Sequence, residues 1–174
     1  MSDYHETTAR MQAIIETVIH ELWSQGTPEL HNLYCFPELL CCDAEQRTAA
    51  YRYNTYPWME NRIQAVHGGI VALLMDNSMG LTALGLYNHH APTVSMTVNY
   101  CRSVPIGAPI EVRTKVTSCG RTLVTTSAEL LTAASQKLLV TATGTYYARS
   151  DLHRTRQILP QILEKTKPEA DRKA

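Results

Sequence analysis

The sequence predicts an α+β fold in which an antiparallel sheet wraps around one long apolar helix. Residues 68–86 form an apolar stretch that is entered through a glycine pair. A helix that is apolar on nearly every side needs cover on every side. From Pro92 onward, apolar and polar residues alternate with a period of two, which indicates half-buried strands. A chain of 174 residues is long enough to bury one real core.

The first part of the chain predicts a helix and a single strand. Apolar residues recur at helical spacing, so residues 4–24 should form an amphipathic helix. The tripeptide Gly26-Thr27-Pro28 should end it, and residues 29–46 have the composition of a loop. An alternating segment at 50–56, closed by Pro57, is the expected first strand.

Four strands are expected after the long helix, at residues 93–100, 110–117, 122–131 and 137–147. Their connections are short and contain turn residues, and such connections join antiparallel neighbours. We therefore expect a five-stranded sheet whose last four strands form a meander. The segment 150–174 contains Pro160 and a charged end, which indicates a short helix followed by a frayed terminus.

Composition excludes several classes of function. Sixteen basic and sixteen acidic residues give no net charge, which argues against nucleic-acid binding and against a polybasic membrane surface. Five cysteines without CxxC spacing favour a reducing compartment over a disulfide framework or a metal cluster. The N-terminus has no apolar signal segment, so we expect a cytoplasmic protein. The stretch 68–87 could span a bilayer by length, but its interruption at 76–78 and its glycines favour a buried helix and no membrane span.

Asp76 is the outstanding candidate for chemistry. It lies inside the most apolar stretch of the chain. A carboxylate in such surroundings costs several kcal/mol, on the order of the penalty for burying a charge, unless it is paired, hydrated or protonated. It is therefore either a satisfied structural group or a catalytic one.

The residues around Asp76 resemble a known pattern. Asn61 precedes His67-Gly68-Gly69 by five intervening residues, and Asp76 follows after six more. With the strand 93–100 and the turn Gly120-Arg121-Thr122, this pattern resembles the hotdog-fold acyl-CoA thioesterases over residues 46–148. The phenylacetate-type branch and the branch of mammalian thioesterase superfamily member 2 are the most similar.

The resemblance implies a hotdog fold and an organisation into three parts. These are an N-terminal helical extension at 1–30, a thioesterase domain at 31–150 and a C-terminal tail at 151–174. The implied reaction is hydrolysis of an acyl-CoA to a carboxylic acid and free coenzyme A. It needs no cofactor, because the CoA thioester is itself the substrate.

If His67 and Asp76 belong to one site, their spacing requires that site to be shared between subunits. His67 and Asp76 are nine residues apart, so on one helix they lie ~13 Å apart along the axis and about 180° apart around it. They cannot meet one substrate atom unless they come from two subunits related by a two-fold axis. The resemblance implies such an obligate homodimer, in which one chain supplies the Asp and the other the His-Gly-Gly. Whether two dimers pair into a tetramer stays open.

The resemblance also implies roles for the catalytic residues. The Gly68 N–H, at the positive end of a helix, would hold the oxyanion, a contact typically worth about 3–4 kcal/mol. His67 would orient the turn and the substrate, or act only as a helix cap. Asp76 would activate water or attack the carbonyl directly, and both routes stay open. Asn61 would bind the water or the leaving group, or satisfy the backbone of its own turn.

The remaining candidates are hydroxyls and groups for the coenzyme A moiety. Thr93 occupies the position where the mammalian branch has a serine, and Ser95 should share its face, so either hydroxyl could serve. Arginines and free amides at turns suit phosphate groups. The substrate-binding candidates are Gly69, Ser95, Arg102, Ser103, Ser118, Gly120, Arg121, Thr122 and Tyr147.

Two other functions fit the same scaffold. A non-catalytic module that binds acyl-CoA or fatty acyl groups would keep the pocket without turnover. Hydratases of the hotdog class carry a run of the type Asp-x4-Asn-x4-His, which this sequence lacks.

Overall fold

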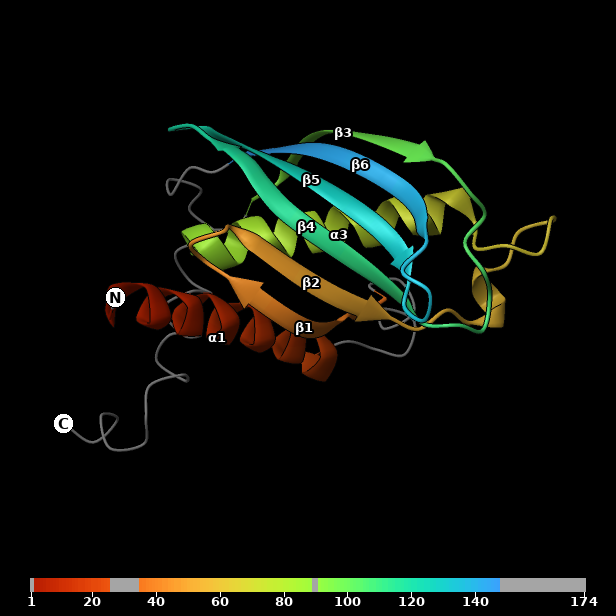
Figure 1. The fold of residues 1–174 in the computed structure, drawn as a ribbon, viewed down its shortest axis with the longest axis horizontal. Helices are drawn as coiled ribbons and strands as arrows, with labels where there is room; N and C mark the ends of the chain where they lie inside the picture. Colours follow the sequence, from red (N-terminus) through yellow and green to blue (C-terminus); the bar gives the residue numbers. More distant parts are fainter. Residues whose placement is uncertain (1, 26–34, 89–90, 148–174) are drawn as a thin grey trace.

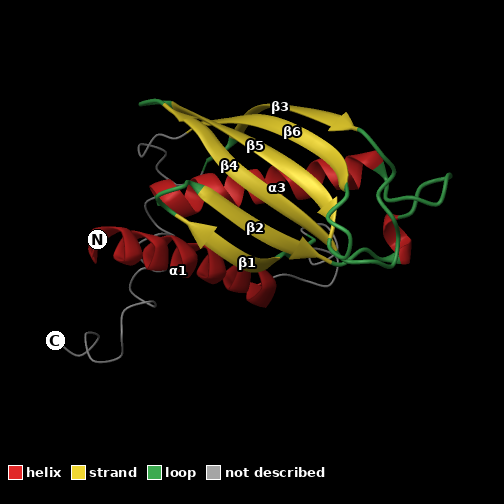
Figure 2. Cartoon of the chain, viewed as in Figure 1, coloured by secondary structure: helices red, strands yellow, loops and turns green. Residues whose placement is uncertain are grey.

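The domain consists of a curved antiparallel sheet wrapped around one long helix, with a second helix across the open side (Figures 1 and 2). The computed structural model describes residues 2–25, 35–88 and 91–147. The α+β fold expected from the sequence is confirmed. Its elements are α1 (Ser2–Gln25), β1 (Glu38–Asp43), β2 (Thr48–Tyr53), η1 (Pro57–Met59), α3 (Gly68–Tyr87), β3 (Thr93–Tyr100), β4 (Ile110–Cys119), β5 (Leu123–Thr132) and β6 (Leu138–Tyr147).

Helix α3 is the centre of the core. It buries Leu74, Met75 and Met79 completely against the inner face of the sheet. Its buried hydroxyls are satisfied by tyrosines of β2: Tyr53 Oη lies 2.8 Å from Ser78 Oγ, and Tyr51 Oη lies 2.9 Å from Thr82 Oγ1. Among the described residues, α3 is the one helix long and apolar enough to cross a membrane, and half of that stretch is buried inside the domain.

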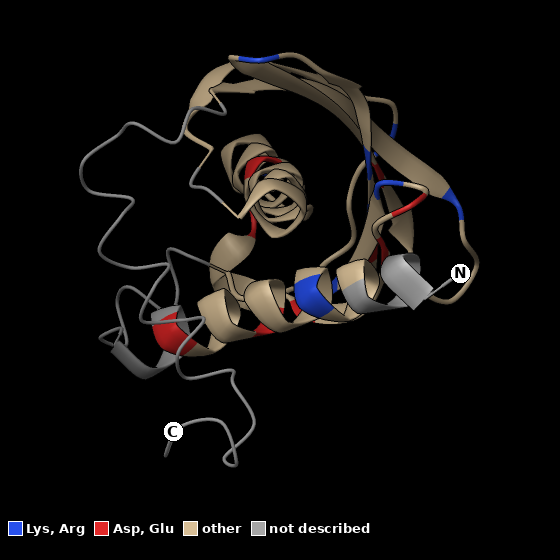
Figure 3. Ribbon diagram, turned by 90° about the vertical axis from the view of Figure 1, so that its left-hand side faces the viewer, with Lys and Arg blue, Asp and Glu red and all other residues tan. Residues whose placement is uncertain are grey.

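Helix α1 is part of the same core. It buries Met11 and Ile15 against α3 and lies across the side of α3 that the sheet leaves open (Figure 3). The two helices come very close at Gly85, where an added Cβ would lie 2.7 Å from Ile15 Cγ1. Helix α1 is therefore packed on the sheet and α3 as a second layer.

The sheet has six strands, so the expectation of five was wrong. The extra strand, β1, lies in the segment 29–46 that was expected to be a loop. Its pairing with β2 is interrupted by a bulge between Leu39 and Cys41, and a bulge removes the regular alternation that identifies a strand in a sequence. Contacts with α1 help to hold this edge: the Ala44 N–H donates to Thr8 Oγ1 at 3.1 Å.

The expected four-strand meander is correct only for β4, β5 and β6. The strand order is β1-β2-β4-β5-β6-β3, so β3 pairs with β6 at the end of the sheet. The segment 101–109, expected to be a tight turn, instead crosses the end of the molecule. It is held there by the segment before α3: the Val66 N–H donates to Val104 O at 2.9 Å, and Thr55 Oγ1 donates to Ala108 O at 2.9 Å.

Candidate active site

Asp76 is half-buried in the third turn of α3, and two hydroxyl groups orient it. Thr93 Oγ1 donates to Asp76 Oδ1 at 2.8 Å, and Tyr146 Oη donates to the same oxygen at 2.9 Å. Within the part of the chain that the structure describes, Oδ2 accepts no hydrogen bond. One oxygen is therefore anchored, and the other is available to a water molecule or a substrate.

Tyr146 is the site residue that the sequence analysis missed. Its side chain is only 1% exposed. Burial raises its pKa, and the negative charge of Asp76 adds to the effect, so the phenol remains a protonated donor. Its ring lies over Gly144, where an added Cβ would lie 2.7 Å from a ring carbon. The absence of a side chain at 144 is thus what lets the Tyr146 hydroxyl reach Asp76.

Tyr147, a candidate for contact with the coenzyme A moiety, is the neighbour of Tyr146 on the same strand. Adjacent strand residues point to opposite faces, so Tyr147 faces away from the side that carries Tyr146. The signal that could have selected Tyr146 is the alternation of apolar residues at 140, 142, 144 and 146 with polar residues between them.

A β-bulge separates the two candidate hydroxyls on β3. Thr93 pairs with Tyr146, whereas Ser95 pairs with Thr145, so one extra residue lies between them. Residues directly opposite each other in an antiparallel pair share a face. Thr93 therefore faces α3 with Tyr146, and Ser95 faces the other side. The expectation that Ser95 shares the face of Thr93 was wrong, because the bulge shifts the alternation by one residue.

The His67-Gly68-Gly69 segment forms the start of α3 and is close to the surface. His67 is the N-cap, and its Nδ1 accepts from the Gly69 N–H at 3.0 Å. A neutral ring that accepts through Nδ1 carries its proton on Nε2, which is left to donate outward. The Val71 N–H donates to His67 O at 3.0 Å. Among the described residues, the Gly68 N–H has no hydrogen-bond acceptor, as needed for an oxyanion donor.

Asn61 shapes the turn that leads to this helix start. Its Oδ1 accepts from the Ile63 N–H at 2.9 Å and from the Ala65 N–H at 3.2 Å. The His67 N–H in turn donates to Met59 O at 2.7 Å. The amide oxygen of Asn61 is therefore used inside the turn, and its Nδ2 group is what remains for a ligand.

Helix geometry separates the two halves of the expected site within one chain. His67 caps α3 and Asp76 lies nine residues further, ~13 Å along the axis. Each half is tied to a different end of β3. Thr93, the first residue of β3, binds Asp76, and Tyr100, the last, donates from its hydroxyl to Gly68 O at 2.8 Å.

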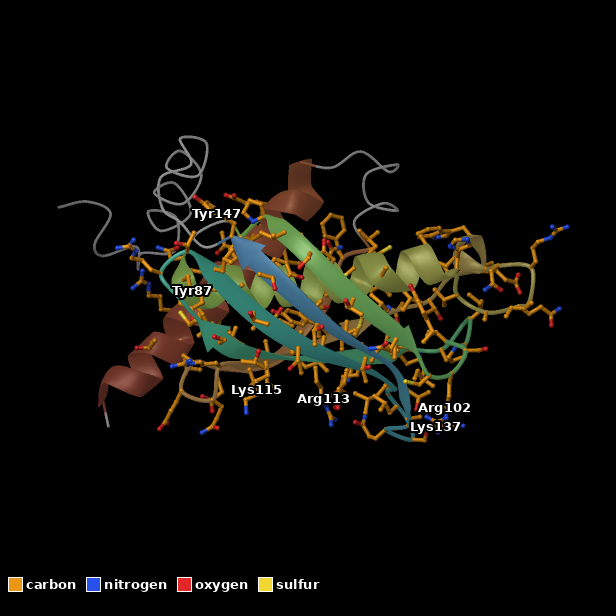
Figure 4. The ribbon with its side chains drawn as sticks, turned by 90° about the horizontal axis from the view of Figure 1, so that it is seen from above. Tyr87, Arg102, Arg113, Lys115, Lys137 and Tyr147 are labelled. Atoms are coloured by element: carbon orange, nitrogen blue, oxygen red, sulfur yellow. The ribbon has the colours of Figure 1, made fainter. Side chains whose placement is uncertain are left out.

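A single chain does not bring the coenzyme A candidates together either. Arg102 donates to Leu138 O at 2.8 Å, at the beginning of β6. The turn with Ser118, Gly120, Arg121 and Thr122 leads into Leu123, which pairs with Tyr147 at the end of β6. Arg102 and Tyr147 accordingly lie at opposite ends of the molecule in Figure 4. Ser103 lies beside Arg102 and is exposed like it.

A cavity of about 350 Å³ opens beside Asp76. Asp76, Thr93 and Tyr146 form its polar side. Its remaining lining is mostly apolar and comes from α1, from α3 and from the segments before β1 and β3. A volume of this order, with few polar groups converging on an apolar space, is typical of small-molecule sites.

Comparison with known proteins shows what this arrangement is similar to. The family model of the thioesterase superfamily matches residues 64–138, which include the start of α3, Asp76 and β3. The resemblance to the hotdog thioesterases is confirmed. Human acyl-coenzyme A thioesterase 13 is 36% identical over 81 residues, 45% of this chain. The chain matches only 57% of the length of that relative.

Solved structures show the same fold. Mouse thioesterase superfamily member 2 superposes with a TM-score of 0.67 at 17% identity, covering 78% of this chain and 95% of that one. A Streptococcus mutans protein bound to acetyl-CoA superposes with a TM-score of 0.60 at 18% identity, covering 65% and 88%. The expected hotdog fold is therefore confirmed.

Proposed function

We propose that this protein hydrolyses an acyl-CoA thioester to a carboxylic acid and free coenzyme A, at a site formed by two subunits. The thioesterase superfamily match and the acyl-coenzyme A thioesterase 13 relative support hydrolysis of a thioester. The acetyl-CoA bound to the Streptococcus mutans neighbour supports a CoA ligand.

The position of β3 is the main observation that supports a site shared between two subunits. β3 is the last strand of the sheet, and Val94 and Tyr100 on it are 58% and 54% exposed. An exposed edge strand is a template for pairing with another chain. Two copies related by a two-fold axis pair such edges antiparallel. The Tyr100 end of one β3, with Gly68, then lies opposite the Thr93 end of the other, with Asp76.

The same pairing joins the two groups of coenzyme A candidates. Arg102 and Ser103 follow the Tyr100 end of β3, and the turn at 118–122 lies two strands from its Thr93 end. Neighbouring strands are about 4.8 Å apart, and three such spacings separate the turn from the partner's β3, so in the dimer these groups lie about 14 Å apart. Backbone amides and Arg121 at this turn suit phosphate groups.

The reaction follows from these groups. Asp76 uses Oδ2 to take a proton from water that attacks the thioester carbonyl, or attacks the carbonyl itself before water releases the acid. In both routes the Gly68 N–H of the partner chain holds the oxyanion, the C–S bond breaks, and the thiolate leaves and takes up a proton. Thr93 and Tyr146 keep the carboxylate oriented throughout.

Release of free thiol from a panel of acyl-CoAs tests the activity, and mixed dimers test the sharing of the site. Asp76→Asn removes the carboxylate and Gly68→Pro removes the N–H donor. A dimer that contains only one of these variants should therefore be inactive. Co-expressed in equal amounts, the two variants form half mixed dimers with one intact site each, which restores about a quarter of the wild-type activity. A site contained in one chain gives no restoration, because every chain then carries a defect.

A binding module gives a different result in the same assay. Tight binding of acyl-CoA by calorimetry, with no thiol released by the wild-type dimer, contradicts hydrolysis and favours the non-catalytic alternative.

A further inference from the structure

One stripe of α3 runs away from the catalytic carboxylate along the cavity. Asp76, Gly80, Leu81 and Leu84 all line it, and this spacing places them on one face of the helix. Asp76 and Leu84 are eight residues apart, which is ~12 Å of helix. The cavity is thus polar where Asp76 lies and apolar for the next two turns.

Helix α1 forms the facing side. Val18 and Ile19 line the cavity, where Val18 packs with Leu84 and Leu81 of the α3 stripe, and Phe36 also lines it. The position of α1 is fixed by its packing, because Met11 and Ile15 are buried and Gly85 of α3 admits Ile15 at close range. This side of the cavity is therefore as firmly placed as the core itself.

The size of the cavity limits what it can hold. Its volume is about 350 Å³. A methylene group takes up about the same space as a water molecule, whose share of liquid volume is about 30 Å³, so the cavity holds roughly ten carbons. Its ~12 Å length along α3 suits an extended chain better than a short, broad aryl group.

We propose that this cavity receives a straight aliphatic acyl chain of about ten carbons, and that Val18 and Ile19 of α1 determine its length. The inference rests on the thioesterase function proposed above and names the substrate class for that site. With the carbonyl beside Asp76, the acyl tail extends past Gly80 and Leu81 towards the contact between Leu84 and Val18 of α1. Each added methylene improves binding about fourfold until the cavity is full, after which the improvement stops.

Substitutions at Ile19 test the role of α1. Ile19 is partly buried and lines the cavity, whereas its neighbour His20 is exposed on the same helix. Ile19→Trp fills the cavity and should move the preferred acyl length to fewer carbons, with the kcat/KM ratio of decanoyl- to butyryl-CoA falling at least tenfold. Ile19→Ala enlarges the cavity and should move the preference to longer chains. His20→Trp adds the same bulk outside it and should leave the profile unchanged.

Binding of S-alkyl-CoA thioethers with four to sixteen carbons gives a readout that needs no turnover. Wild type should show affinity that rises to about ten carbons and then levels off, and Ile19→Trp should level off earlier. Melting temperatures of all three variants establish that they are folded.

The outcomes separate the two proposals. Thiol release with the wild-type chain-length profile retained in both Ile19 variants overturns the role of α1 and leaves the thioesterase function intact. No thiol release from any acyl-CoA, with thioether affinity that still levels off near ten carbons, overturns hydrolysis and retains the acyl cavity. Thioether affinity independent of chain length overturns the cavity assignment.

Discussion

The two ends of the proposed catalytic site on α3 are held in different ways. At the Asp76 end, side chains from β3 and β6 fix one carboxylate oxygen. Gly144, which has no side chain, leaves room there for the ring of the buried Tyr146. At the Gly68 end, His67 and Gly69 are exposed, and the contacts to the backbone are made by the His67 ring and by the exposed Tyr100. One chain thus completes the surroundings of Asp76, whereas the start of α3 lies at the surface, as the proposed contact with a partner chain requires.

Loss of the carboxylate should have the largest effect. Asp76→Asn keeps the shape and the hydrogen bonds from Thr93 and Tyr146 but cannot accept a proton or attack, so kcat should fall about 10²- to 10⁴-fold. Thiol release under saturating acyl-CoA measures this, with the oligomeric state as a check on folding. Ser95→Ala, on the opposite face of β3, is the matched control and should keep its activity. Turnover of Asp76→Asn near the wild-type rate contradicts the assignment.

Loss of the oxyanion donor should have the second-largest effect on kcat. Gly68 is the first residue of α3, where proline is well tolerated, and His67 has φ −58° and ψ 135°, an extended conformation suited to the residue before proline. Gly68→Pro deletes one N–H while keeping the helix start, so kcat should fall about 10²- to 10³-fold. Gly68→Ala keeps the N–H, and its Cβ meets the Tyr100 ring at an ordinary 3.6 Å. Equal losses in the two variants would indicate obstruction of the site and contradict a role for the N–H.

The support of Asp76 by Tyr146 should have a smaller effect. Tyr146→Phe removes one of two donors to Oδ1, so kcat should fall about tenfold with little change in KM. Tyr147→Phe removes a phenol hydroxyl from the neighbouring residue, which lies on the other face of β6, and is the matched control. An equal change in both variants would show that the loss is not specific to Asp76.

Gly144→Ala tests the contact between Tyr146 and Asp76 in a second way, by disturbing the packing of the Tyr146 ring. The new methyl group lies 2.7 Å from the Tyr146 ring, so the ring must move and the free energy of unfolding should fall by about 1–3 kcal/mol. Combining Gly144→Ala with Tyr146→Phe should then cost no further activity than Gly144→Ala alone. An additive loss in the double variant indicates that Gly144 acts by another route.

The last prediction concerns the buried phenols of the sheet, whose effect on stability is smallest at neutral pH. Burial raises the pKa of Tyr51, Tyr53 and Tyr146 above that of a free tyrosine. Unfolded tyrosines lose their protons near pH 10, while the folded ones keep theirs. Stability is therefore full below about pH 10 and falls as the pH rises further, by up to about 1.4 kcal/mol per pH unit for each tyrosine.

Urea unfolding between pH 8 and 11 measures this slope. Tyr53→Phe should have a shallower slope than wild type because one buried phenol is gone. Tyr100→Phe removes an exposed phenol near the start of α3 and serves as the comparison. A wild-type slope that is flat above pH 10 contradicts the contribution of the buried phenols.

Several features of the protein follow from its amino-acid sequence without further information. They are the α+β class, the long core helix and the strands β4 to β6, whereas the pairing of His-Gly-Gly with Asp76 is what the resemblance to the hotdog thioesterases implies. Periodicity and spacing are local properties, so they can be recognised along a single chain. The separation of His67 from Asp76 likewise follows from the rise per residue of an α-helix, so the two residues can belong to one site only if two subunits form it.

Features that depend on partners distant in the chain required the tertiary structure. β1 lacks the alternation of a strand and pairs beside α1, and β3 crosses the molecule to lie against β6. The bulge that turns Ser95 away, and the pairing that places Tyr146 rather than Tyr147 on Asp76, are matters of register. Register is set by packing between strands, and a shift of one residue moves every following side chain to the other face.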